Sequence, residues 1–191
     1  MSAGAADAGQ WGERMERLSL KSIPGGCLAV LILLAAIGPA GAVQPGDPGP
    51  EWELTSAEGE EIVFPAHARG APAVLFFWAT WCPYCHAVMP YLDAIRSDYA
   101  EAAVNIYAIN FKDDGDPVAH MQELGYGFVV LPLGDLVADD YGVWGAPGLL
   151  VTDGEGNVVY RRGDTQAPPG TAIAEQWDRE IRAALDAALG R

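Results

Sequence analysis

The main pattern in this sequence is a series of short apolar runs bounded by polar or glycine-rich turns. The run Ala71–Trp78 is apolar throughout and has the length of a strand, which predicts a strand buried on both faces at the centre of a sheet. Other runs predict a strand at Val104–Asn110 and a short strand or extended segment at Phe128–Leu133. Two pairs of runs joined by polar turns predict hairpins: Trp52–Leu54 with Ile62–Phe64, and Leu149–Thr152 with Asn157–Arg161.

Between these runs, apolar residues recur at helical spacing. They predict a helix over about Cys82–Tyr99, with Pro90 as a kink inside it. Asp116 and Pro117 form a good N-cap and first-turn pair, which predicts a second helix running to Gly125.

The C-terminal third contains two more helical patterns. Leu136–Tyr141 predicts one or two helical turns, and Thr171–Leu189 places its apolar residues on one face of an amphipathic helix. A strand-helix-strand order followed by a hairpin and a covering helix predicts an α/β domain. We expect a mixed central sheet with helices on both faces.

The N-terminal 43 residues differ in character from the rest. Residues 1–22 carry basic residues close to an uncharged run, which predicts a cytoplasmic n-region, and residues 23–43 are apolar or small. This run approaches the roughly 20 residues that span a bilayer, so it could remain as a membrane anchor. Ala40-Gly41-Ala42 also fits a signal-peptide cleavage pattern, so cleavage near Ala42 is the alternative. In both cases the rest of the chain is exported.

The exported part is predicted to begin with a spacer. Residues 44–51 are rich in Pro and Gly and predict a linker, and residues 52–191 are expected to form the folded domain. The chain has 191 residues, a net charge of −15 and a pI near 4.3, which argues against nucleic-acid binding. Because residues 1–42 contain three basic and three acidic residues, the exported part holds the whole charge, with Lys112 as its only lysine. Such an acidic surface favours basic or neutral partners.

The chemistry of the sequence centres on two of its three cysteines, Cys82 and Cys85. They lie where a buried strand meets the first turn of a helix. There, free N–H groups and the helix dipole stabilise a thiolate at Cys82, which predicts that Cys82 is the nucleophile. Cys85 is placed to resolve the mixed disulfide that Cys82 forms, and Pro83 and Tyr84 are expected to tune the redox potential. The third cysteine, Cys27, stands apart and is interpreted as an apolar filler.

The motifs around this pair resemble a known fold family. FFWATWCPYC, Phe76 to Cys85, resembles the active-site signature of the exported thioredoxin-fold proteins, and Pro90 matches the helix-kinking proline of that fold. GVWGAP, Gly142 to Pro147, resembles the loop that carries the cis-proline of the fold. The resemblance implies that Pro147 packs beside the disulfide and that the backbone of Ala146 pairs with a substrate strand.

Further motifs narrow the resemblance. INFKDD, Ile109 to Asp114, and YRRGD, Tyr160 to Asp164, are similar to the TlpA/DsbE (CcmG) type of cytochrome c maturation thioredoxin. That resemblance implies a periplasmic, membrane-anchored protein that reduces disulfides of apocytochrome c or its maturation partners and is recharged by a membrane reductant. The chain departs from the family pattern twice. Gly148 replaces the usual Glu after the cis-proline, and Phe76 replaces the buried Asp of cytoplasmic thioredoxins, so the proton acceptor for Cys85 stays open.

Other residues near the pair have weaker signals. His86 follows it and, if cationic, would lower the pKa of Cys82. Trp81 and Trp144 are candidates for substrate contact, together with Pro83 and Tyr84 of the motif. We expect no bound cofactor and no metal, because His67 and His120 are isolated in the sequence and there is no second cysteine pair.

Several rival interpretations stay open at this stage. Within the enzyme class, the protein could be a general periplasmic disulfide oxidant or isomerase. A non-catalytic thioredoxin-like binding module, or an inert stabilising disulfide, would use the same residues. The letters CPYCH also match the attachment motif of c-type haem, with His86 as one axial ligand and Met89 or Met121 as the other. The preceding buried strand, Pro90 and the GVWGAP loop are left unexplained by the haem interpretation.

Overall fold

The computed structural model describes residues 41–163 and 170–191. The n-region, Cys27 and almost all of the membrane segment predicted over residues 23–43 lie outside the described residues. Within the described ranges, no helix is both long and apolar enough to cross a membrane.

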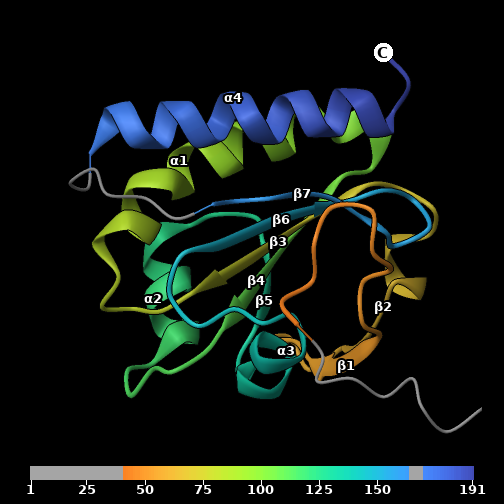
Figure 1. The fold of residues 1–191 in the computed structure, drawn as a ribbon. Helices are drawn as coiled ribbons and strands as arrows, with labels where there is room; N and C mark the ends of the chain where they lie inside the picture. The colour runs from red at the N-terminus through yellow and green to blue at the C-terminus, as the bar shows by residue number, and fades with distance from the viewer. Residues whose placement is uncertain (1–40, 164–169) are drawn as a thin grey trace, which may run out of the picture. The chain divides into compact units, whose positions relative to one another are not determined.

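Five strands form one mixed sheet in the order β5-β4-β3-β6-β7, and two more strands form a separate antiparallel hairpin (Figure 1). The central strand β3 pairs parallel with β4 and antiparallel with β6, and β4 pairs parallel with β5. The strands are β1 Trp52–Thr55, β2 Glu61–Phe64, β3 Ala73–Trp78, β4 Asn105–Asn110, β5 Val129–Leu131, β6 Gly148–Thr152 and β7 Val158–Arg161.

In the described part of the chain, four α-helices cover the sheet: α1 Pro83–Asp98, α2 Pro117–Leu124, α3 Asp135–Asp140 and α4 Thr171–Ala188. Both α1 and α2 start with a proline, whose fixed φ suits a first helical turn and whose missing N–H costs nothing there. The carboxylate of Asp116 caps α2 by accepting the N–H groups of Val118 and Ala119, which confirms the predicted N-cap. Pro90 lies inside α1.

The sheet separates two hydrophobic cores. Alternate residues of β3 face opposite sides, so Phe76 and Trp78 enter one core and Leu75 and Phe77 enter the other. The helix-side core packs the sheet against α1, α4 and Met121 of α2, and the hairpin-side core packs it against β1, β2 and α3. Figure 1 shows α1 and α4 on one side of the sheet and the β1–β2 hairpin with α3 on the other. The prediction of a mixed sheet with helices on both faces, and with a fully buried central strand, is therefore confirmed.

The segment predicted to be a linker is attached to the domain. The N–H of Gly46 donates to the carbonyl of Val158 at 2.8 Å, and the N–H of Gly49 donates to that of Gly156 at 3.0 Å. Strand β7 is the last strand of the sheet, so its outer edge has free backbone groups that this segment satisfies. Residues 44–51 therefore differ from a free spacer: they are hydrogen-bonded to the β6–β7 hairpin.

Candidate active site

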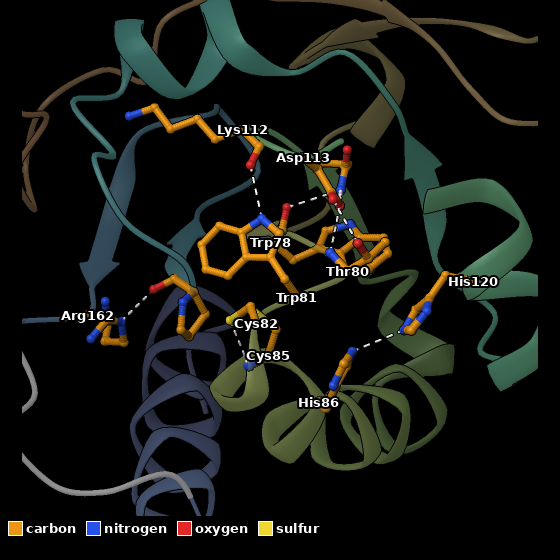
Figure 2. The surroundings of a disulfide bond; sticks show 12 residues. Trp78, Thr80, Trp81, Cys82, Cys85, His86, Lys112, Asp113, His120 and Arg162 are labelled. Atoms are coloured by element: carbon orange, nitrogen blue, oxygen red, sulfur yellow. Dashed lines mark hydrogen bonds between the residues drawn. A yellow bond between two sulfur atoms is a disulfide. The ribbon is translucent and has the colours of Figure 1, made fainter. Parts of the chain in front are cut away.

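Cys82 and Cys85 form a disulfide where β3 leads into α1 (Figure 2). Their Cα atoms lie 5.3 Å apart. Cys82 is the N-cap of α1, with extended backbone angles (φ −88°, ψ 105°), and Pro83 is the first helical residue. The backbone N–H of Cys85 donates to the Sγ of Cys82 at 3.1 Å. The Cys82 sulfur therefore occupies the place of an N-cap side chain and accepts an N–H of the first helical turn, which the sulfur shares with the carbonyl of Cys82 at 3.1 Å.

Two opposing effects act on this sulfur. Cys82 is only 1% exposed, and burial disfavours a thiolate. The directed N–H and the positive end of α1 favour a thiolate. Cys85 has no exposed surface and lies within the helix rather than at its N-cap, so the cap position that accepts an N–H belongs to the sulfur of Cys82.

Two exposed tryptophans, Trp81 and Trp144, both contact Lys112. Trp81 precedes Cys82, is 57% exposed, and its indole N–H donates to the carbonyl of Lys112 at 3.0 Å (Figure 2). The ammonium of Lys112 lies 5.4 Å from the centre of the Trp144 ring, which is 70% exposed. Both tryptophans are sequence candidates, but the sequence analysis did not identify Lys112 as the residue that joins them.

A carboxylate holds the backbone just before the motif. Asp113 accepts hydrogen bonds from the N–H and the hydroxyl of Thr80 at 2.6 and 2.7 Å, from the side-chain amide of Asn110 at 2.7 Å, and from the N–H of Gly115 at 3.1 Å (Figure 2). Partial burial opposes ionisation of this group, but the hydrogen bonds outweigh it and lower the pKa of Asp113 below its ordinary value. The sequence analysis did not identify Asp113 as a residue of the site, because nothing local marks its contact with Thr80.

The loop expected to carry the cis-proline does so, since the peptide bond between Ala146 and Pro147 is cis. The next residue, Gly148, is the first departure from the family pattern that the sequence resembles. A Cβ at Gly148 would lie 2.6 Å from Val143 Cγ1 and 3.0 Å from Phe77 Cβ, so even the first atom of a side chain would overlap the core. The second departure, Phe76, has no exposed surface and stacks near Trp78 in the helix-side core.

His86 has a partner that the sequence analysis missed. Its Nε2 lies 3.0 Å from the Nε2 of His120, and the two rings are stacked with centroids 5.0 Å apart (Figure 2). His120, treated as isolated on sequence grounds, also packs against the Trp78 ring. Partial desolvation, and secondarily the charge of His120, lower the pKa of His86. His86 is therefore cationic over a more acidic range of pH than an unperturbed histidine.

The geometry does not match the haem interpretation. Both cysteine sulfurs, which haem attachment would use, are bonded to each other. Met89 and Met121 are 0% and 2% exposed in the helix-side core, and His86 pairs with His120. The two sulfurs and His86 are thus engaged with other partners, and both methionines are buried in the core.

Comparisons with known proteins show the family to which the chain belongs. The AhpC/TSA family matches residues 45–161. The thiol:disulfide interchange protein DsbE of Escherichia coli (strain K12) is 30% identical over 142 residues, covering 72% of this chain and 71% of that protein. The thiol-disulfide oxidoreductase ResA of Geobacillus thermodenitrificans (strain NG80-2) is 29% identical over 160 residues, covering 76% and 87%. The crystal structure of a candidate DsbE from Chlorobium tepidum has a TM-score of 0.64 at 24% identity, covering 75% and 99%.

A thioredoxin-like fold with paired cysteines at the head of its first helix defines an enzyme that exchanges thiols and disulfides. The chain belongs to the AhpC/TSA family and, within it, to the thiol-disulfide oxidoreductases of the DsbE and ResA type.

Proposed function

We propose that this protein reduces disulfides of other exported proteins, with Cys82 as the nucleophile and Cys85 as the resolving thiol. The observation that carries the proposal is the N–H of Cys85 directed at the Cys82 sulfur at 3.1 Å. The same donor would stabilise a thiolate in the reduced enzyme. The direction of the reaction is supported by the resemblance to the cytochrome c maturation thioredoxins.

The reaction follows from two successive displacements. The Cys82 thiolate attacks one sulfur of the substrate disulfide, which forms a mixed disulfide and releases one substrate thiolate. The thiolate of Cys85 then attacks the Cys82 sulfur, closes the Cys82–Cys85 disulfide and releases the second substrate thiolate. The two cysteines lose two electrons and the substrate gains them. A reductant dithiol must return two electrons before the next cycle.

The substrate surface is formed by the motif and the cis-proline loop. We infer that the backbone of Ala146 pairs with an extended substrate segment beside Pro147, and that Trp81, Pro83 and Tyr84 contact the substrate around the disulfide. Trp81 and Pro83 are exposed, which makes both accessible to a polypeptide. Tyr84 is half-buried, with its ring centre 6.2 Å from that of Trp177.

The location and partners are also part of the proposal. Residues 23–43 keep the protein at the inner membrane, facing the periplasm, and cleavage near Ala42 is the alternative. Apocytochrome c or its maturation partners are the substrates, and a membrane protein with a dithiol is the reductant. The acidic surface, with a net charge of −15 on the chain, favours encounters with basic substrates.

Trapping in cells tests the proposal. Cys85→Ala leaves Cys82 able to attack but removes the thiol that releases the mixed disulfide, so substrates should accumulate covalently bound to Cys82. The double variant, with Cys82 also changed to Ala, is the matched control. We expect the single variant to trap proteins that contain haem-attachment cysteines.

The set of trapped proteins discriminates between the rival functions. A broad set of exported proteins without haem-attachment cysteines would contradict the maturation role and indicate a general oxidant or isomerase. An empty set, in cells where the variant is abundant, would contradict thiol exchange and favour a binding module.

A further inference from the structure

Two adjacent arginines at the end of β7 reach opposite ends of the cis-proline loop, residues 142–147. Arg161 donates through Nη1 to the carbonyl of Tyr141 at 2.8 Å and through Nη2 to that of Gly142 at 2.7 Å. Arg162 donates through Nε to the carbonyl of Pro147 at 2.8 Å (Figure 2). In each of these hydrogen bonds the donor is a charged guanidinium group and the acceptor is a backbone carbonyl. Hydrogen bonds with a charged donor are shorter and stronger than those between two neutral groups.

Backbone hydrogen bonds of the β6–β7 hairpin hold both arginines in place. Arg161 is the last residue of β7 and pairs with Leu150 of β6, and the N–H of Arg162 donates to the carbonyl of Leu149 at 2.8 Å. Successive residues of a strand point to opposite faces, which explains why neighbours in the sequence reach different ends of one loop. Because the loop runs directly into β6, the hairpin that carries the arginines also carries the loop.

Arg162 further connects the loop to the active-site motif. Its guanidinium lies 5.3 Å from the centre of the Trp177 ring in α4, and Trp177 is 1% exposed. The ring centre of Trp177 lies 6.2 Å from that of Tyr84, which stands between the two cysteines in the sequence. The chain of contacts Pro147–Arg162–Trp177–Tyr84 thus links the cis-proline to the disulfide motif.

The loop is not packed on all sides. A hollow of about 380 Å³ lies beside it, lined in part by Trp144, Gly145 and both arginines. Trp144 and Gly145 in the middle of the loop are exposed beside this hollow, and the carbonyls at the two ends of the loop accept hydrogen bonds from the two guanidinium groups.

We propose that Arg161 and Arg162 are positioning residues, which hold the loop so that the backbone of Ala146 receives a polypeptide substrate at a fixed place beside Cys82. The inference rests on the proposed function, and it makes the arginines determinants of polypeptide binding. Neither arginine takes part in the sulfur chemistry.

The test compares two disulfide substrates with the purified full-length protein in a mild detergent. Insulin is the polypeptide substrate, and 5,5′-dithiobis(2-nitrobenzoic acid) is a small disulfide that has no strand to pair with Ala146. Arg162→Gln is expected to raise the KM for insulin on the order of tenfold, a loss equivalent to about one charge-assisted hydrogen bond, with kcat changed less than about twofold. Its kcat/KM for the small disulfide should fall much less.

Three further variants complete the test. Arg161→Gln should raise the insulin KM in the same way, since it releases the other end of the loop. Arg162→Lys keeps a cation that can donate to the Pro147 carbonyl, so it should recover most of the insulin KM, and it serves as the comparison if Arg162→Gln does not fold. Arg179→Gln removes an exposed positive charge from α4 and is the matched control for charge alone.

The outcomes separate this inference from the proposed function. An unchanged insulin KM in folded Arg162→Gln, or an equal loss with both substrates, would overturn the positioning role. An effect of similar size in Arg179→Gln would overturn it too, because net charge would then be the cause. If the wild-type protein exchanges disulfides with neither substrate, the proposed function itself fails, and the inference fails with it.

Discussion

Cys82→Ser should lose the reduction of insulin disulfides by about a thousandfold or more, because a serine hydroxyl does not ionise near neutral pH and cannot form a disulfide. The fold should survive the change. Serine is a favoured N-cap residue, so its oxygen can accept the N–H of Cys85 in place of the sulfur. The thermal midpoint should therefore stay close to that of the reduced wild-type protein.

Cys27→Ser is the control for this variant, because Cys27 is the third cysteine of the chain and is not part of the motif. It should keep wild-type turnover in the same assay, with dithiothreitol as the reductant. Substantial turnover in Cys82→Ser together with complete loss in Cys85→Ser would mean that the roles of the two cysteines are reversed.

Asp113→Asn should lower the free energy of unfolding by about 2 kcal/mol, the usual scale for a hydrogen bond to a charged group. For a domain of this size that corresponds to a fall of roughly 4 to 8 °C in the thermal midpoint. The carboxylate accepts four hydrogen bonds, and an amide group cannot accept them all because one of its two ends is a donor. Asp114→Asn, at an exposed neighbour, should change the unfolding free energy by less than about 0.5 kcal/mol.

Acid should remove the difference between Asp113→Asn and wild type. Because folding lowers the pKa of Asp113, its ionised form favours the folded state. The stabilisation by the ionised carboxylate is complete above the pKa of Asp113 in the unfolded chain, about 3.9. It is lost as the pH falls through the lower pKa that Asp113 has in the folded protein. Denaturation curves at pH 7 and at progressively lower pH should therefore converge for the two proteins. A difference that stays constant with pH would contradict a role for the charge.

Much of the fold could be predicted because its signals are local. The run Ala71–Trp78 has no polar residue, and the structure places β3 there, buried on both faces. Apolar residues at helical spacing located α1, and the capping and first-turn pair Asp116 and Pro117 located the start of α2. The chemistry of the cysteine pair could likewise be predicted, because it depends on four consecutive residues, Cys82 to Cys85, at the start of a helix.

The supporting contacts of the site could not be predicted, because each joins positions far apart in the chain. Asp113 holds Thr80 across 33 residues, and His86 meets His120 across 34. Neither pair has a spacing that helical or strand periodicity would reveal. Only the order of β3, β4 and α2 around the sheet brings them together.

For residues 44–51, amino-acid composition predicts the local structure but not the contacts with the rest of the domain. Pro and Gly in residues 44–51 correctly indicate the absence of regular structure, apart from one isolated bridge at Pro48. Composition cannot show whether an irregular segment is free or bound to a neighbour. Here the unpaired edge of β7 accepts it, and that edge exists only after the sheet has formed.

The central claim is that the first turn of α1 holds the Cys82 sulfur as a thiolate in the reduced protein. The most direct measurement is the rate of alkylation by iodoacetamide as a function of pH, followed separately at Cys82 and Cys85 by mass spectrometry. The account predicts that Cys82 reacts with a midpoint below about pH 7.5, within the range of activated cysteines, and that Cys85 reacts much more slowly throughout. A Cys82 midpoint at about pH 8.5 or above, the value of an ordinary thiol, would contradict it.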